Sequence, residues 1–195
     1  MRYCGKRRFF YVTSYLSVLE QNAESMKEVL QNKEYILEHH SNVVREQDVE
    51  ERLDLTQLLT QTWDAPIIVT TMVQMLNTLF DGSGSCIRRF SSLCSSVIVI
   101  DEVQTVPGNL LSLFHLAVNF LSGACGATIV LCSATQPCSE AALRPIRIPT
   151  REMVPHDPEL WPVFCRTHIV DAGAVSLEGV PALAAQILEE AGSLL

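Results

Sequence analysis

Two adjacent carboxylates follow a short apolar run in the middle of the chain. Val97 to Ile100 are β-branched, and they lead directly into Asp101 and Glu102. Acids at the end of a buried strand suit magnesium chemistry, because an aspartate can hold Mg²⁺ through its water shell while a longer glutamate deprotonates an attacking water. A single acid here could equally be a helix cap or turn. The pair predicts a magnesium-dependent site of the kind found in nucleoside triphosphatases.

Polar residues also end two further apolar runs. Thr70 and Thr71 end the run 65–71, and Ser133 and Thr135 end the run 127–135. Open α/β sheets bind ligands at the carboxyl ends of their strands. We therefore expect these hydroxyl groups to share one edge of a sheet with the two acids.

The chain alternates between strand-like and helix-like patterns. Predicted helices follow predicted strands, and the strands are apolar on both faces, which indicates a parallel sheet covered by helices on both sides, an α/β fold. Residues 32–62 are polar and predict an exposed helix that ends near Trp63. The strands are expected at 8–13, 65–71, 97–101, 127–135 and, later, 165–172, and the helices at 14–31, 72–80, 109–121 and 177–195.

Composition limits the kinds of partner. The formal net charge of −8 and the 48% hydrophobic content indicate a globular chain without a broad basic surface for nucleic acid. The basic clusters at 6–8 and 88–89 and the pair His39–His40 are expected at the solvated surface. The seven cysteines contain no C-x-x-C pair, and no apolar run is long enough to span a membrane, so a cytoplasmic protein with reduced thiols is expected.

Several segments resemble helicase motifs. DEVQ at 101–104 and SAT at 133–135 resemble motifs II and III of superfamily-two helicases, and IVTTMVQ at 68–74 resembles motif Ib. With YVTSYLSVLEQNA at 11–23 and LEHHSN at 37–42, they are similar to the helicase portion of the CRISPR-associated helicase–nuclease of type I interference systems, a DEAD/DEAH-like helicase. The resemblance covers most of residues 8–137.

The resemblance implies a RecA-like fold, ATP and Mg²⁺ as cofactors, and single-stranded DNA and a CRISPR surveillance complex as partners in antiviral defence. Asp101 would be the water-mediated magnesium ligand, Glu102 the catalytic base, and Gln104 a sensor of the nucleotide or of a partner domain. Ser133 and Thr135 would couple hydrolysis to strand movement. The DNA backbone would contact Thr70, Thr71, Gln74 and Ser17, although Ser14-Tyr15-Leu16-Ser17 stands where the family often has Pro-Tyr-Thr-Ser.

No phosphate-binding loop is present. The motif G-x-x-x-x-G-K-[ST] does not occur, and Cys4-Gly5-Lys6-Arg7 is its nearest equivalent. We therefore expect residues 1–150 to be a first RecA-like domain that lacks the phosphate-loop strand, and residues 151–195 to be a linker and the start of a second domain that is otherwise missing. The strand at 127–132 would then be an edge, and the isolated chain would be inactive.

A second interpretation remains open. The chain could be a non-catalytic, degenerate RecA-like module that binds DNA or a partner protein. The intact DEVQ and SAT segments favour the ATP-dependent translocase, because a binding module has no use for a base and a metal ligand.

Overall fold

The structure is a computed structural model that describes residues 5–30, 35–40, 57–135 and 143–153, together with positions 181, 184 and 185. The chain divides into two compact units, residues 1–149 and 150–195. All described strands lie in the first unit. The strand predicted at 165–172 and most of the helix predicted at 177–195 lie outside the described residues.

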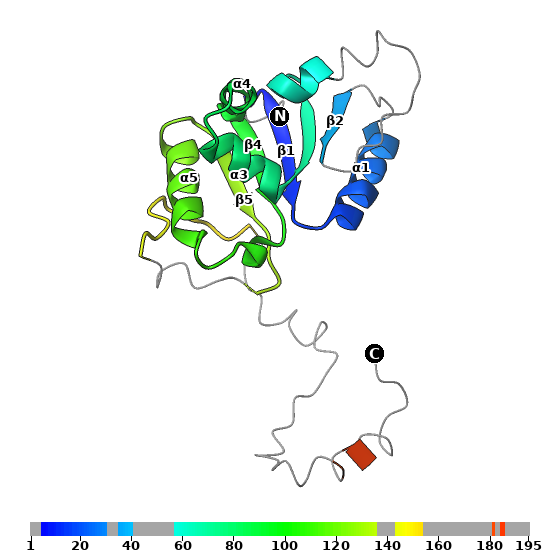
Figure 1. The fold of residues 1–195 in the computed structure, drawn as a ribbon, viewed down its shortest axis with the longest axis vertical. Helices are drawn as coiled ribbons and strands as arrows, with labels where there is room; N and C mark the ends of the chain where they lie inside the picture. Colours follow the sequence, from blue (N-terminus) through cyan, green and yellow to red (C-terminus); the bar gives the residue numbers. More distant parts are fainter. Residues whose placement is uncertain are drawn as a thin grey trace. The chain divides into compact units, whose positions relative to one another are not determined.

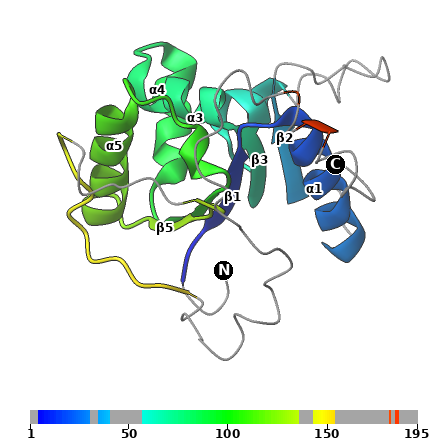
Figure 2. The same cartoon turned by 90° about the horizontal axis from the view of Figure 1, so that it is seen from below.

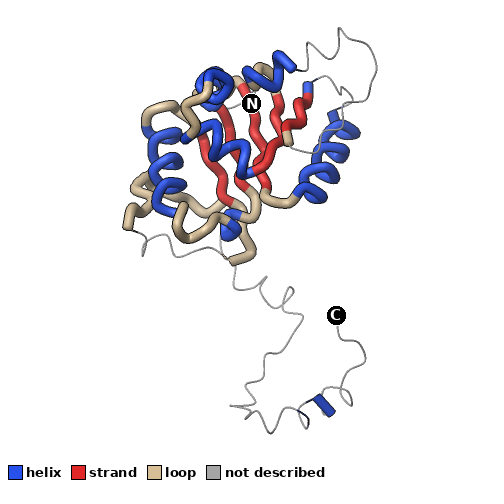
Figure 3. The backbone as a smooth tube through the Cα atoms, in the orientation of Figure 1, coloured by secondary structure: helices blue, strands red, loops and turns tan. Residues whose placement is uncertain are grey.

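Five parallel strands form one sheet in the order β2-β3-β1-β4-β5. Figure 1 shows the strands lying side by side, and Figure 3 draws them in red. The central strand β1 (Arg8–Thr13) pairs with β3 (Ile67–Thr71) and with β4 (Ser96–Ile100). At the two sides, β2 (Ile36–His39) pairs with β3, and β5 (Thr128–Leu131) pairs with β4. The predicted parallel α/β sheet is confirmed.

Helices cover both faces of the sheet. Because successive residues of a strand point to opposite faces, a strand can contribute side chains to two separate cores. On β1, Phe10 and Val12 belong to the larger core, which also contains buried residues of the helices α3 and α5, whereas Tyr11 packs with Leu19 and Ala23 of α1. Figure 2 shows α1 separated by the sheet from the other helices. The helices are α1 (Leu16–Leu30), α3 (Met72–Phe80), α4 (Gly84–Leu93) and α5 (Leu111–Gly123), and a 3₁₀ turn, η2 (Val103–Thr105), follows β4.

The sequence patterns did not predict β2 or α4. β2 is only four residues long, and Glu38 and His39 follow its buried Ile36 and Leu37, so it lies within a stretch that reads as polar. α4 begins after Ser83 in a Gly/Ser segment, and its buried positions include Arg89 and polar Ser92. An apolar periodicity cannot detect a helix whose inward face is partly polar.

A buried tryptophan packs against His39 and Arg89, two residues that were expected at the solvated surface. Trp63 is fully buried, its ring lies 5.5 Å from that of Phe10, and its indole N–H donates to Nδ1 of His39 at 3.1 Å. The Arg89 guanidinium lies 5.6 Å from the Trp63 ring centroid, and its Nε donates to the carbonyl of Thr60 at 2.8 Å. His40 is buried as well. The expectation of a solvated position is therefore wrong for Arg89 and His40, whereas His39 is half-buried.

The strand β5 lies at the edge of the described sheet, as expected for residues 127–132. Its residues Ile129, Val130 and Leu131 are half-buried, and within the described part of the chain no strand pairs with its outer side. Beyond β5, residues 144–147 lie along α5, where Nδ1 of His115 is 2.9 Å from the carbonyl oxygen of Arg144. None of the helices in the described ranges is long and apolar enough to cross a membrane.

Candidate functional site

The two acids predicted to do chemistry lie at the carboxyl end of β4. The backbone N–H of Asp101 donates to the carbonyl of Val12 on β1 at 2.8 Å, which continues the β1–β4 pairing beyond Ile100. On the other side, the N–H of Cys132 donates to the carbonyl of Ile100 at 2.8 Å, and the N–H of Val103 donates to that of Cys132 at 3.1 Å. Backbone hydrogen bonds from both sides therefore fix the turn that carries the acids.

The Asp101 carboxylate accepts one hydrogen bond on each oxygen. The Tyr11 hydroxyl donates to Oδ2 at 2.6 Å, and the backbone N–H of Glu102 donates to Oδ1 at 3.0 Å. Burial of Tyr11, followed by its hydrogen bond to Asp101, raises the pKa of that hydroxyl, so it remains a proton donor. Burial, and then the negative charge of Asp101, raise the pKa of the Cys132 thiol.

Glu102 adopts a left-handed backbone conformation, with φ 54° and ψ 45°. This region is unfavourable for a residue with a side chain and recurs at active sites. Its carbonyl accepts from both the N–H of Thr105, at 2.9 Å, and the Thr105 hydroxyl, at 2.7 Å. These two bonds help to maintain the strained turn.

A continuous hydrogen-bond chain links the DEVQ segment to the SAT segment. The Gln104 side-chain amide donates to Oε2 of Glu102, and its carbonyl oxygen lies 2.6 Å from the Ser133 hydroxyl, which donates to it. The Ser133 hydroxyl is also 2.7 Å from the carbonyl of Thr135, and it accepts from the Thr135 N–H at 3.1 Å. Five of the predicted site residues are thus brought together: Asp101, Glu102, Gln104, Ser133 and Thr135.

The predicted DNA-contacting residues lie near the carboxyl ends of β1 and β3. The Thr71 side chain caps α3 by accepting from the N–H of Gln74 at 3.3 Å, and both side chains are half-buried. Thr70 is buried, and its hydroxyl donates to the carbonyl of His39 at 2.8 Å. Ser17 is exposed in the first turn of α1. Thr71, Gln74 and Ser17 are therefore at least partly accessible to solvent. The buried Thr70 hydroxyl instead links β3 to β2.

Sequence reasoning did not identify Tyr11, Asn22 or Thr105 as site residues. Tyr11 sits in the middle of an apolar strand, and Asn22 lies on a helix eleven positions later, where nothing in the local pattern relates it to Asp101. The only signal for Thr105 was its closeness to DEVQ along the chain. Only the parallel pairing of β1 with β4 places Tyr11 beside Asp101.

The oxygen ligands at this site fit magnesium. Mg²⁺ is usually held through one or two carboxylates, with waters and substrate phosphates completing its coordination. Asp101 keeps lone pairs free on both oxygens after its two hydrogen bonds, and Glu102 follows directly. Among the described residues no group of three or more His, Cys, Asp or Glu side chains could enclose a metal ion by itself. A dedicated protein cage is not needed for the predicted role.

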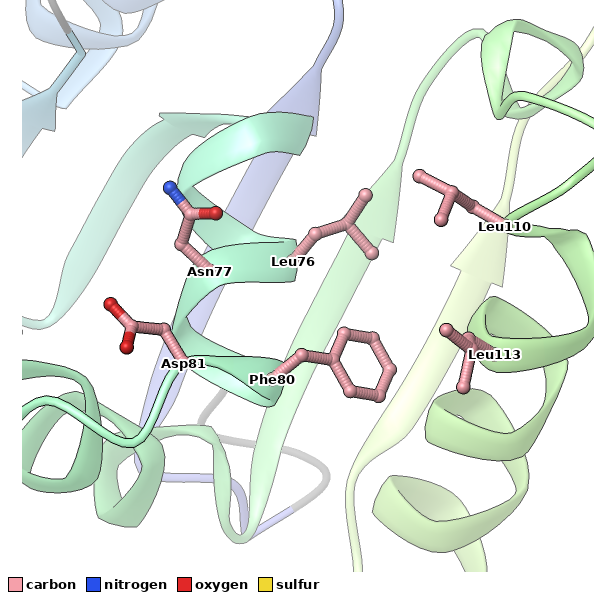
Figure 4. Close-up of a pocket in the computed structure, with 6 residues that line it drawn as sticks. All are labelled: Leu76, Asn77, Phe80, Asp81, Leu110 and Leu113. Atoms are coloured by element: carbon pink, nitrogen blue, oxygen red, sulfur yellow. The ribbon is translucent and has the colours of Figure 1, made fainter.

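A separate apolar cavity of about 450 Å³ lies between α3 and α5. In Figure 4, Leu76 and Phe80 of α3 face Leu110 and Leu113 across it. The remaining lining residues are Asn77 and Asp81, so no cationic side chain and none of the predicted site residues lines the cavity. Its chemistry does not suit nucleotide phosphates.

The all-parallel sheet, with acids at the end of β4 and hydroxyl groups after β5, defines a RecA-like α/β fold. Three solved structures of T. fusca Cas3 are similar to the chain: the complex with AMPPNP (TM-score 0.56, 23% identity over 68% of this chain), the complex with ATP (0.52, 22%, 66%) and Cas3 itself (0.53, 21%, 66%). The chain therefore has a Cas3 helicase-like fold, as the sequence motifs predicted. No family model and no curated protein matches the chain.

The chain spans only a small part of those proteins. It covers 16% of the AMPPNP-bound Cas3 chain and 15% of each of the other two. The similarity therefore concerns the fold of one portion of a much longer protein.

Proposed function

We propose that this chain carries the metal-binding and catalytic-base half of the ATP site of a Cas3-like helicase that moves on single-stranded DNA. The observation that carries the proposal is the hydrogen-bond chain from Glu102 through Gln104 to Ser133. It joins the predicted base to the predicted coupling motif, although the two are about thirty residues apart. A fold without catalytic function has no need for such a connection.

Each residue of the site has a role that its surroundings support. Asp101 would hold Mg²⁺ through water, and the ion would neutralise charge on the ATP phosphates. Glu102 would accept a proton from the attacking water, for which its carboxylate must be both oriented and ionised. The Gln104 amide donates to this carboxylate and so helps to fix its orientation.

Ser133 offers a physical basis for coupling. Its hydroxyl has one proton and two acceptors within reach, the Gln104 side-chain oxygen at 2.6 Å and the Thr135 carbonyl at 2.7 Å. A change in the hydrogen bonding of Glu102 during hydrolysis would move Gln104, and the Ser133 hydroxyl would then turn to donate to the Thr135 carbonyl instead. The segment after β5 would respond to the state of the nucleotide.

DNA contact is proposed for the exposed or half-buried polar groups at the same edge of the sheet. Ser17, Thr71 and Gln74 carry short hydroxyl or amide groups, which suit contacts to a phosphate backbone that do not depend on base sequence. Such local contacts are compatible with the net charge of −8. A CRISPR surveillance complex as partner remains a proposal that rests on the resemblance.

The ATP phosphates require groups that this sequence does not contain, because it has no G-x-x-x-x-G-K-[ST] motif. The resemblance places the strand that leads into this loop beside β5. We therefore expect weak ATP binding by the chain alone. The test fuses a strand and a Gly-x-x-x-x-Gly-Lys-Thr loop to its amino end.

Binding of a fluorescent ATP analogue to the fusion is measured with and without Mg²⁺. We expect Mg²⁺-dependent binding that Asp101→Asn abolishes and Asp64→Asn preserves. Asp64 is the matched control, because it is exposed and pairs with Arg8 near the amino ends of β1 and β3. If nucleotide binding requires no Mg²⁺ and is unchanged in Asp101→Asn, the proposal is contradicted and the non-catalytic module is favoured.

A further inference from the structure

A buried tyrosine and a helix asparagine form a second layer around Asp101. Tyr11 is 8% exposed, and its hydroxyl oxygen is 2.6 Å from Oδ2 of Asp101 and 2.6 Å from Nδ2 of Asn22. The Asn22 amide can only donate to this oxygen through Nδ2, and a phenol has one proton. The Tyr11 proton must therefore point to Asp101.

This arrangement fixes the direction of the Asp101 carboxylate. Tyr11 cannot swing away easily, because its ring packs with Leu19, Ala23 and Val69 between the sheet and α1. The Glu102 N–H holds the other carboxylate oxygen. Rotation of the carboxylate would break one or both hydrogen bonds, so its free lone pairs keep one orientation toward the waters of a bound ion.

We propose that Tyr11 and Asn22 are positioning residues for Asp101, and that Asn22 thereby connects the metal site to α1; this rests on the proposed function. Hydrogen-bond partners of metal-binding carboxylates set their orientation and basicity. Asn22 lies on the same rigid helix as the exposed Ser17. A displacement of α1 would withdraw the amide, free the Tyr11 proton to turn, and weaken the hold on the ion.

The test measures the affinity of the full chain for Mn²⁺ in the absence of nucleotide. Mn²⁺ can replace Mg²⁺ and is detected by electron paramagnetic resonance. Affinity is measured for Tyr11→Phe, Asn22→Leu and Asp101→Asn at a temperature where circular dichroism shows every variant folded. The matched controls are Tyr35→Phe, at a tyrosine that is 51% exposed, and Asn77→Leu, on an exposed position of α3. Affinity reports positioning, whereas a purely structural role would change only the melting temperature.

We expect Asp101→Asn to abolish binding at this site and Tyr11→Phe to weaken it about tenfold. Asn22→Leu should also lower the affinity for Mn²⁺. Both control variants should bind Mn²⁺ as the unmodified chain does. Adding Tyr11→Phe to Asp101→Asn should cause no further loss of affinity. If Asp101→Asn abolishes binding while Tyr11→Phe and Asn22→Leu do not change it, the positioning role is wrong and the proposed function stands. If Asp101→Asn binds Mn²⁺ normally, the metal role itself fails.

Discussion

Single residues show how much of the site depends on hydrogen bonding that is already in place. Glu102 is held in a left-handed conformation by Thr105, and its carboxylate is oriented by Gln104. Such strain costs about 1 to 3 kcal/mol and persists only where the surroundings enforce it. The hydrogen bonds of Thr105 and Gln104 supply that enforcement at the end of β4.

His39 makes stability depend on pH. Burial, followed by the charge of Arg89, lowers the pKa of His39 from 6.5 to about 4. The neutral ring accepts the Trp63 indole N–H, and protonation of Nδ1 would abolish that bond. The unfolded chain binds a proton near pH 6.5 and the folded chain only near pH 4, so the free energy of unfolding should fall as pH drops through this window.

We expect this fall to be about 1 to 3 kcal/mol larger in the unmodified chain than in His39→Gln, which cannot titrate. Urea unfolding at a series of pH values between 7 and 4 measures the difference. Other groups titrate equally in both proteins and cancel. Parallel stability curves for the two proteins would show that folding does not lower the pKa of His39.

At the scale of elements, the sequence predicts the strands and helices that have a clear apolar pattern, and the polar residues that end the strands. β1, β3, β4 and β5, together with α1, α3 and α5, were all predicted to within a few residues. So was the placement of Asp101 and Ser133 at one edge of the sheet, because parallel strands bring their carboxyl ends to the same edge. The pairing of acid and hydroxyl motifs could therefore be derived without coordinates.

The elements that were not predicted depend on contacts distant in sequence. α4 is attached to residues 57–62 by polar bonds, from Arg89 to the Thr60 carbonyl and from Ser92 to the Thr62 carbonyl. Likewise, Tyr11 becomes a site residue only through the register of β1 against β4. A local pattern contains no information about such partners, so neither could be found from the sequence.

The edge strand β5 gives a prediction at this scale. Exposed strand edges invite pairing with another chain, and a charged side chain on the edge discourages it. We expect the chain to self-associate as its concentration rises, and Val130→Lys to reduce this association. Sedimentation velocity measures both effects.

Val73→Lys is the control, because Val73 is 64% exposed on α3 and lies on no strand. It should leave association unchanged. A chain that stays monomeric at all concentrations would refute the prediction. So would an equal effect of the two lysines, since that would indicate contact through apolar helix surfaces instead.

At the scale of the whole molecule, the chain has a Cas3 helicase-like fold, on which we propose half of an ATP site. The fold is shared with T. fusca Cas3 over about two thirds of this chain, 66–68%. In the proposed site, the described residues would supply an oriented metal ligand, a base and a connection to the SAT segment. They do not supply the phosphate-binding loop, which is why the chain alone should not turn over ATP.

The most direct measurement is the steady-state rate of ATP hydrolysis by the fusion that carries a phosphate-binding loop, with Mg²⁺ and single-stranded DNA present. We expect hydrolysis that Glu102→Gln lowers about 100-fold or more while nucleotide binding is retained, because only the base is lost. Glu28→Gln, at an exposed position near the end of α1, should hydrolyse ATP normally. If the fusion binds Mg²⁺ and ATP but Glu102→Gln hydrolyses ATP as fast as Glu28→Gln, the acids at the end of β4 do not form the catalytic half of an ATP site.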